Sequence, residues 1–96
     1  MYKILFAKSF LVDYERLSLK DTVLKKKVLK VIELLTVDPF YPSLKSHKVY
    51  ARNIGPAWAS WVSGDIRIIW EYNENNQLSL DVLAIGSHTG KNKVYN

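Results

Sequence analysis

The spacing of hydrophobic and polar positions gives the first third of the chain a helical period and most of the remainder a strand period. Residues 2–7, YKILFA, are apolar and rich in strand-forming side chains, which predicts a short first strand. Apolar residues then recur with the spacing of one helix face, at Phe10, Leu11, Tyr14 and Leu17. Ser9 can cap this helix, so we expect it to begin there.

A second helix is predicted over residues 20–35, KDTVLKKKVLKVIELL. Ser18 and Asp21, three residues apart, resemble a capping signal at its start. Its apolar residues share one stripe: Leu24, Val28, Val31, Ile32 and Leu35. The lysines lie largely off that stripe, which is typical of a solvated face. Asp38-Pro39 ends the helix, because proline cannot continue it and restricts the residue before it.

Strand-like segments follow at 47–51, 57–63, 66–73 and 78–86, after a proline-punctuated connection. Ser63-Gly64-Asp65 is a hairpin signal between the second and third of them. One strand, two helices and then three or four strands predict an α+β fold, in which two N-terminal helices pack on one face of a mainly antiparallel, four- to five-stranded sheet. We expect one domain over residues 1–96.

Strand alternation predicts which side chains the helices cover. On 66–73 the covered face is Ile66, Ile68, Trp70 and Tyr72, and on 78–85 it is Leu78, Leu80, Val82 and Ala84. Trp58 and Trp61 fall on opposite faces of their strand. Arg67 lies on the uncovered face, where it either pairs with Glu71 or Asp81 or binds an anion.

Composition narrows the class of protein. The chain has no cysteine, so neither disulfides nor thiolate chemistry contributes. No secretory signal and no run of about 20 apolar residues is present, so we expect a soluble, cytoplasmic protein without membrane association. Fourteen Lys and Arg against nine acidic residues give a net charge of +5, which favours a polyanionic partner such as nucleic acid, although many small proteins are simply basic.

The chemistry-bearing residues follow the helices: Lys45, His47, Lys48, Arg52, Arg67, His88, Lys91, Lys93 and Tyr95. Cleavage of RNA by its own 2′-hydroxyl needs a base, an acid and cations around the phosphorane, and histidine suits the proton transfers. No metal or other cofactor is expected, because two separated histidines without cysteine make a poor zinc site. His47 as a solvated loop residue and His88 as a turn residue are the plainer alternatives.

Three segments carry a resemblance to a known family: PSLKSHKV, the stretch W-x-x-W-V-S-G-D-I-R-I-I-W-E-Y, and DVLAIGSHTGKNKVY. They resemble the RelE/ParE superfamily of bacterial type II toxins, and in particular its histidine-using, YafQ-like branch. The resemblance covers essentially the whole chain in element order. Its most specific parts are residues 64–72 and 85–95.

The resemblance implies a curved sheet like that of microbial ribonucleases and a metal-independent endoribonuclease, an mRNA interferase, that cuts translated mRNA on the ribosome. A cognate antitoxin is the implied partner. Arg67 then binds the scissile phosphate, His88 is a general acid or base, Tyr95 is the terminal aromatic, and His47 is a second proton-transferring residue. RNA-binding roles are implied for Lys45, Lys48, Arg52, Lys91 and Lys93; Arg52 and Asp65 are the weaker assignments.

Two departures from the family pattern shape this expectation. Residues 39–70 contain no glutamate, so proton abstraction falls to His47 or His88. Six residues separate His88 from Tyr95, so the tail must fold back if both serve one site. A toxin of this kind needs its last residues for activity. We therefore expect the tail IGSHTGKNKVYN to be part of the site and not a frayed end. The alternatives are a ParE-like inhibitor of DNA gyrase and a non-catalytic homologue that only binds antitoxin or RNA.

Overall fold

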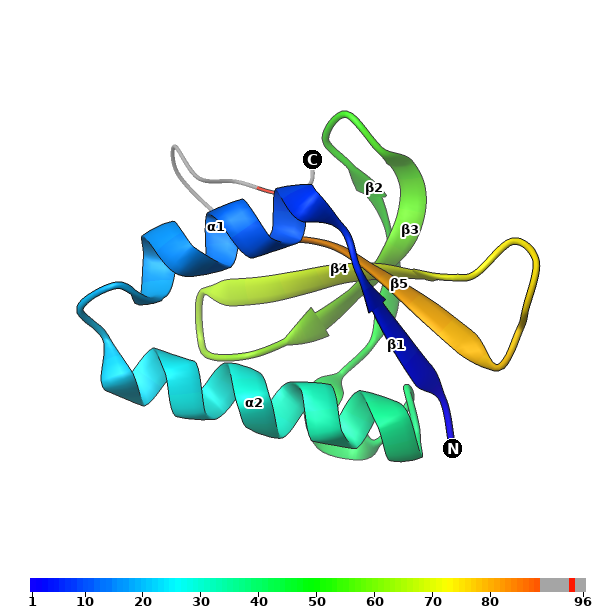
Figure 1. The fold of residues 1–96 in the computed structure, drawn as a ribbon, viewed down its shortest axis with the longest axis horizontal. Coiled ribbons are helices and arrows are strands. Elements are labelled where there is room, and N and C mark those ends of the chain that lie inside the picture. The colour runs from blue at the N-terminus through cyan, green and yellow to red at the C-terminus, as the bar shows by residue number, and fades with distance from the viewer. Residues whose placement is uncertain (89–93, 95–96) are drawn as a thin grey trace.

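The computed structural model describes residues 1–88 and residue 94 (Figure 1). The elements in chain order are β1 (Lys3–Phe6), α1 (Lys8–Ser18), α2 (Thr22–Val37), the 3₁₀ turn η1 (Pro42–Leu44), β2 (His47–Ala51), β3 (Gly55–Trp61), β4 (Ile66–Tyr72) and β5 (Ser79–Ser87). The predicted α+β order of strand, two helices and further strands is confirmed. Neither α1 nor α2 is long and apolar enough to cross a membrane.

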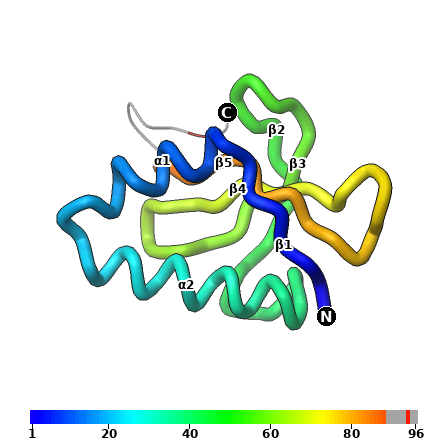
Figure 2. The backbone as a smooth tube through the Cα atoms, viewed as in Figure 1, coloured from blue at the N-terminus to red at the C-terminus, as the bar shows by residue number. Residues whose placement is uncertain are grey.

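The strands form one five-stranded sheet in the order β1-β5-β4-β3-β2. β1 pairs in parallel with β5, and the other three pairings are antiparallel. The chain path in Figure 2 shows the β3–β4 turn and the β4–β5 turn at opposite ends of the sheet, as successive hairpins require. One row of the sheet joins Trp61 on β3, Arg67 on β4 and Gly86 on β5.

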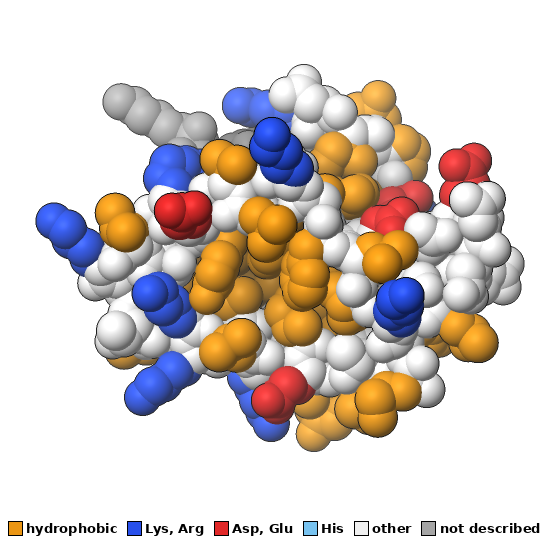
Figure 3. Space-filling model, viewed as in Figure 1, with side chains coloured by type: hydrophobic (Ala, Val, Ile, Leu, Met, Phe, Trp, Pro, Cys, Tyr) orange, Lys and Arg blue, Asp and Glu red, His pale blue; other side chains and the backbone are white. Residues whose placement is uncertain are grey.

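One face of the sheet packs against both helices and forms the main core. The buried residues of this core are Phe10, Leu24, Val28, Val31, Leu35, Leu44, Ile68, Trp70, Leu80, Val82 and Ile85. Trp70 is fully buried, with the rings of Trp58 at 5.9 Å and Tyr72 at 5.4 Å from its own. On the side that carries the helices, hydrophobic side chains gather between α1 and α2, and Lys and Arg side chains lie around them (Figure 3).

The opposite face carries a smaller apolar cluster that contains no helix residue among those described. Its members are Ala51, Ala57, Ala59 and Ile69, with the partly buried Val49, Ala84 and Val94. We call this the open face. Arg67 and Ile69 alternate with the core residues Ile68 and Trp70 along β4, so the prediction that Arg67 lies away from the helices is confirmed.

The helix starts differ in part from the prediction. Asp21 does cap α2, because its side chain accepts a hydrogen bond from Leu24 N at 2.9 Å. The prediction for α1 is wrong: Ala7 is the N-cap, and Ser9 lies inside the helix. The Ser9 hydroxyl instead donates to the carbonyl of Leu83 at 2.7 Å, so it ties α1 to β5.

A bulge in β5 overturns the predicted alternation of its second half. Ile69 pairs with Ala84, but the next residue of β4, Trp70, pairs with Val82. The extra residue, Leu83, reverses the faces beyond it. Ile85 is therefore in the core at 1% exposure, and Ala84 lies on the open face, contrary to prediction. Leu78, also predicted under the helices, precedes the strand and is 66% exposed.

A chain of hydrogen bonds links the core to the connection after α2. Trp70 Nε1 donates to Ser60 Oγ at 2.7 Å. Ser46 Oγ donates to the carbonyl of Pro39 and lies 2.6 Å from Ser60 Oγ. Since a hydroxyl has one proton and Ser46 uses its own on Pro39, Ser60 must donate to Ser46. The chain joins β4, β3 and the segment that leads into β2.

Substitution of Ser60 by Ala should lower the free energy of unfolding by about 1–3 kcal/mol, because the buried indole N–H of Trp70 loses its acceptor. Urea denaturation followed by circular dichroism measures the change. Ser43→Ala, at an exposed position of η1, is the matched control and should change stability by less than about 0.5 kcal/mol. Equal stability of the two variants would show that the hydrogen-bond chain contributes nothing.

Candidate active site

The turn between β3 and β4, residues 62–65, is the centre of the candidate site. Val62 N and Ser63 N donate to the carbonyl of Ile66 at 2.9 and 3.3 Å, and Ser63 Oγ accepts from Ile66 N at 3.1 Å. Side chains from β4 and from the end of β5 then bind the same turn. Residues far apart in sequence are thereby held around a few main-chain groups.

His88 follows β5 and is held against Asp65 of this turn. Its main-chain N–H donates to the Asp65 carbonyl at 3.0 Å. Its ring Nδ1 lies 3.1 Å from the same carbonyl and 3.1 Å from Asp65 Oδ1. Ser87 Oγ donates to the other carboxylate oxygen, Oδ2, at 2.6 Å. Ser87 thus orients the Asp65 carboxylate, and this carboxylate orients the ring of His88.

These contacts determine which ring nitrogen of His88 carries the proton in the neutral form. A carbonyl and a carboxylate only accept hydrogen bonds, so Nδ1 must be the N–H that faces them. Nε2 then holds the lone pair that can take a proton. Because the side chain is 35% exposed, this nitrogen can be reached from solvent or by a ligand. The geometry suits a general base whose ring is oriented by Asp65.

Arg67 binds the turn from the other side and is only 2% exposed. Its Nη1 donates to the carbonyls of Ser63 at 2.8 Å and Ile66 at 3.1 Å, and its Nη2 donates to the carbonyl of Gly64 at 3.3 Å. The guanidinium carbon lies 4.1 Å from the centre of the Trp61 ring. Nε is buried without a hydrogen-bond partner among the described residues. Neither Glu71 nor Asp81, the partners considered from sequence, forms an ion pair with it in the described structure.

Lys45 reaches the same indole from the connection before β2. Its ammonium nitrogen lies 4.2 Å from the centre of the Trp61 ring. Lys45 has a positive φ of 48°, a left-handed conformation that non-glycine residues rarely adopt. It caps the end of η1, and its own carbonyl lies 2.9 Å from Nδ1 of His47. Two cations from different parts of the chain therefore lie over one tryptophan on the open face.

The other predicted residues of β2 lie farther from His88. β2 and β5 are separated by β4 and β3, roughly 14 Å across the sheet at about 4.8 Å per strand. His47 is exposed at the start of β2. Arg52, exposed just after the end of β2, is nearer to the end of β5 than the strand order indicates, because Val94 is hydrogen-bonded to both Arg52 N and the carbonyl of Ser87. Lys48 pairs with Glu71 at 3.7 Å and lies 5.0 Å from the centre of the Trp58 ring. His88 and Arg67 bind the same turn, whereas His47 is on β2, which is separated from β5 by two strands in the sheet order.

The chain returns to the open face at Val94. Val94 N donates to the carbonyl of Ser87 at 2.8 Å, and the Val94 carbonyl accepts from Arg52 N at 2.9 Å. Its side chain packs against the small apolar cluster of the open face. Lys91, Lys93 and Tyr95, all predicted site residues, lie outside the described residues.

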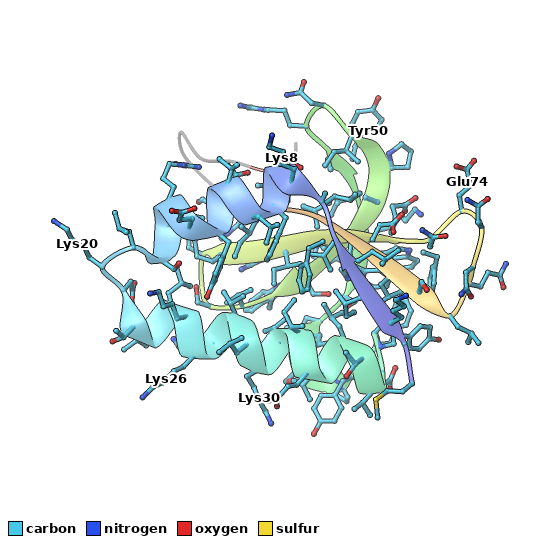
Figure 4. All side chains as sticks on the ribbon, viewed as in Figure 1. Lys8, Lys20, Lys26, Lys30, Tyr50 and Glu74 are labelled. Carbon is cyan, nitrogen blue, oxygen red and sulfur yellow. The ribbon has the colours of Figure 1, made fainter. Side chains whose placement is uncertain are left out.

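The lysines of the helices lie elsewhere. Lys8, Lys20, Lys26 and Lys30 point outward from α1, α2 and the turn between them (Figure 4). Lys26 and Lys30 lie on the solvated side of α2, as predicted for the lysines of that helix. All four are suitable controls for the charge of the open face. Within residues 1–88 and Val94, no three His, Asp or Glu side chains come together as a metal site would require.

Solved structures identify the fold. A YoeB/ParE toxin from Agrobacterium tumefaciens matches with a TM-score of 0.73 and 18% identity over 91% of this chain and 99% of its own. A metal-bound toxin from Helicobacter pylori matches with a TM-score of 0.71 and 22% sequence identity, over 92% of this chain and 96% of its own. A chain of the E. coli DinJ-YafQ complex matches with a TM-score of 0.66 and 20% sequence identity, over 92% of this chain and 94% of its own.

This chain has the fold of the RelE/ParE superfamily toxins. No protein-family model and no curated protein matches its sequence. The resemblance found in the three sequence segments is thereby confirmed for the fold, while the roles of individual residues stay predictions. Within this toxin fold, the predicted residues Arg67 and Lys45 contact Trp61, and the predicted residue His88 contacts Asp65 of the β3–β4 turn.

Three residues of the site carry weak sequence signals or none. Asp65 is part of a Ser-Gly-Asp turn, where aspartate is common for local reasons, so only the family resemblance marks it. Ser87 is not among the predicted residues, because a serine at a strand end has no distinctive pattern. Trp61 is distinguished only by its strand face, opposite to that of Trp58.

Substitution of Arg67 by Met should lower the free energy of unfolding by about 1–3 kcal/mol, because three carbonyl groups lose a charged donor. Chemical denaturation measures the loss. Arg16→Met is the control: its side chain is 55% exposed and pairs with Asp13 at 3.4 Å, so it should change stability by less than about 0.5 kcal/mol. A loss no larger than that of the control would contradict a positioning role for Arg67.

Substitution of Asp65 by Asn should change the tautomer of neutral His88. The amide offers an N–H where the carboxylate offers only acceptors, so part of the population should move its proton from Nδ1 to Nε2. Long-range ¹⁵N–¹H correlation spectra of the imidazole distinguish the two forms. Ser87→Ala keeps both acceptors of Nδ1 and should keep the wild-type tautomer. A wild-type ring protonated on Nε2 would refute the assignment.

Proposed function

We propose that this protein is the toxin of a type II toxin–antitoxin system and cleaves mRNA on the ribosome. The observation that carries the proposal is that Asp65 and Ser87 hold His88 on the same β3–β4 turn that Arg67 binds, while Arg67 and Lys45 both lie over Trp61. A toxin fold without catalytic purpose gives no reason for a histidine with a fixed tautomer at this position. The ribosome and translated mRNA are inferred from the family resemblance.

In the proposed mechanism His88 is the general base. Its Nε2 takes the proton of the RNA 2′-hydroxyl, the 2′ oxygen attacks the adjacent phosphorus, and the bond to the 5′ oxygen of the next nucleotide breaks. The imidazolium is stabilised by Asp65 at Nδ1 and returns the same proton to the departing 5′ oxygen. The products are a 2′,3′-cyclic phosphate and a free 5′-hydroxyl, so the protons balance without a second acid. His47, the other candidate for proton transfer, is on a distant strand.

Two cations divide the electrostatic work in this proposal. Lys45 is exposed, so its ammonium can contact the phosphate directly. Arg67, the residue for which the resemblance implies phosphate binding, already donates to three carbonyls and is buried. We assign it the role of holding the turn that carries Asp65, while its charge adds to the positive potential of the site. Tyr95 follows Val94, whose return to the open face supports the proposal that the tail is part of the site.

An antitoxin is the proposed protein partner. The similar E. coli structure is a DinJ-YafQ complex, and another similar structure from Staphylococcus aureus is a YoeB-YefM complex. A partner that blocks RNA cleavage would have to cover the open face or prevent its access to the ribosome. An acidic segment would be complementary to the net charge of +5.

Primer extension on a defined mRNA in a translating system tests the proposal. Wild-type protein should produce cuts that follow the reading frame and require ribosomes. His88→Ala should reduce the cleavage rate by about 10²–10⁴-fold, the usual contribution of a general base. Lys26→Ala, which removes an outward-pointing cation of α2, is the control and should cut like the wild type.

Each other result changes the conclusion in a defined way. Absence of cuts with every protein, while circular dichroism shows folded chains, would refute the nuclease, and a gyrase supercoiling assay would follow. Cuts that persist in His88→Ala would keep the function and remove His88 from the mechanism. Cuts in free RNA without ribosomes would keep the chemistry and refute the ribosome requirement.

A further inference from the structure

We propose that Trp61 is the platform on which an unpaired RNA base stacks, and that Lys45 occupies the place of that base in the free protein. The inference rests on the proposed function and adds a subsite to it. Base-stacking surfaces for single-stranded RNA are aromatic rings next to cations, which is the chemistry found at Trp61.

Trp61 differs from the other two tryptophans in its surroundings. Trp70 is fully buried in the main core, and Trp58 packs against it on the helix side with Phe40 at 4.9 Å. Trp61 is the last residue of β3, half-buried, and shares the open face with Arg67. It is therefore the tryptophan that a ligand on the open face can reach.

The position of Trp61 relative to His88 suits a nucleotide. Trp61, Arg67 and Gly86 form one row across three neighbouring strands, and His88 is two residues beyond Gly86. Neighbouring strands are about 4.8 Å apart, so roughly 10 Å separates the main chain of Trp61 from that of Gly86. A base on the indole would place its ribose and phosphate between Trp61 and His88.

The two cations over the indole are held with very different strength. Arg67 is buried and bonded to three carbonyls, so it stays against the ring. Lys45 is exposed, and an exposed cation–π contact changes an equilibrium constant by only about 2- to 5-fold. Stacking of a base on an aromatic side chain is worth about 5- to 150-fold. A base should therefore displace Lys45 from the ring, while Arg67 remains.

Once a base displaces the Lys45 side chain from the Trp61 ring, its ammonium is free to bind a phosphate. Its backbone is held in the left-handed conformation at the end of η1, so the residue stays beside the site when its side chain moves. The released ammonium then lies next to the phosphate of the stacked nucleotide. Lys45 would exchange a contact with the ring for one with the phosphate, so that base and phosphate are recognised together.

Equilibrium binding to a ribosome complex tests the inference independently of catalysis. The probe is a ribosome programmed with mRNA whose A-site nucleotides are 2′-deoxy, which removes the nucleophile, and three further mRNAs that each lack one A-site base. Wild-type protein should lose about 5- to 150-fold in affinity when one particular base is missing. Trp61→Leu should show the same loss with the complete mRNA and no further loss with the abasic one.

Variants of Trp61 and of Lys45 distinguish the contribution of base stacking to binding from the contribution of charge. Trp61→Phe keeps a ring and should bind between the wild type and Trp61→Leu, without the folding risk of the leucine. Lys45→Ala should reduce the slope of log Kd against log salt concentration by about 0.7, the value for one contact with a single strand, whereas the Trp61 variants should leave it unchanged. Lys26→Ala, outside the site, should leave both affinity and slope as in the wild type.

The outcomes distinguish this inference from the proposed function. If the wild type binds and neither the missing bases nor Trp61→Phe changes the affinity, the platform is refuted while the nuclease stands. If a missing base weakens binding equally in the wild type and in Trp61→Phe and Trp61→Leu, base recognition lies elsewhere and the platform is again refuted. If the folded wild type binds neither the programmed ribosome nor the mRNA, both the inference and the proposed function fail.

Discussion

Two helices on only one face of a five-stranded sheet impose the constraint from which the site follows. The covered face can use large side chains, such as Trp70 and Ile68, because α1 and α2 bury them. The open face has no helix residue over it among those described, and its apolar residues on β2, β3 and β5 are mostly alanines. Ala51, Ala57 and Ala59 are fully buried, and Val94 packs against their cluster. The larger side chains of this face that stay partly exposed, Trp61 among them, are therefore the ones that a ligand can contact.

The site is built at the end of this face by main-chain groups more than by side-chain pairs. The β3–β4 turn offers carbonyls to the side chains of both Arg67 and His88, so a short hairpin holds a buried cation and a partly exposed histidine. Neither contact needs a long active-site loop. The bonds of both side chains restrict the turn, and the proposed proton transfer between atoms about 3 Å apart requires such a fixed position.

Much of this arrangement could be predicted from the sequence, because apolar residues recur every second position in a half-buried strand and every 3.6 positions in an amphipathic helix. The faces of β4, the helix order and the position of Arg67 away from the helices all follow from that pattern. The bulge at Leu83 could not, since one extra residue leaves no pattern of its own. Nor could the partners of Arg67, because carbonyl groups are the same at every position. The return of the tail is expected only from the family resemblance, since it depends on long-range hydrogen bonds of Val94.

The burial of Arg67 affects how strongly dissolved salt screens the positive charge of the site. No described carboxylate lies within 4.0 Å of its guanidinium, so carbonyl dipoles solvate the charge without neutralising it. Dissolved ions screen exposed lysines over about 8 Å at physiological ionic strength but screen a buried charge much less. The open face thus keeps one unit of positive charge that salt cannot easily screen, held 4.1 Å from the centre of the Trp61 ring.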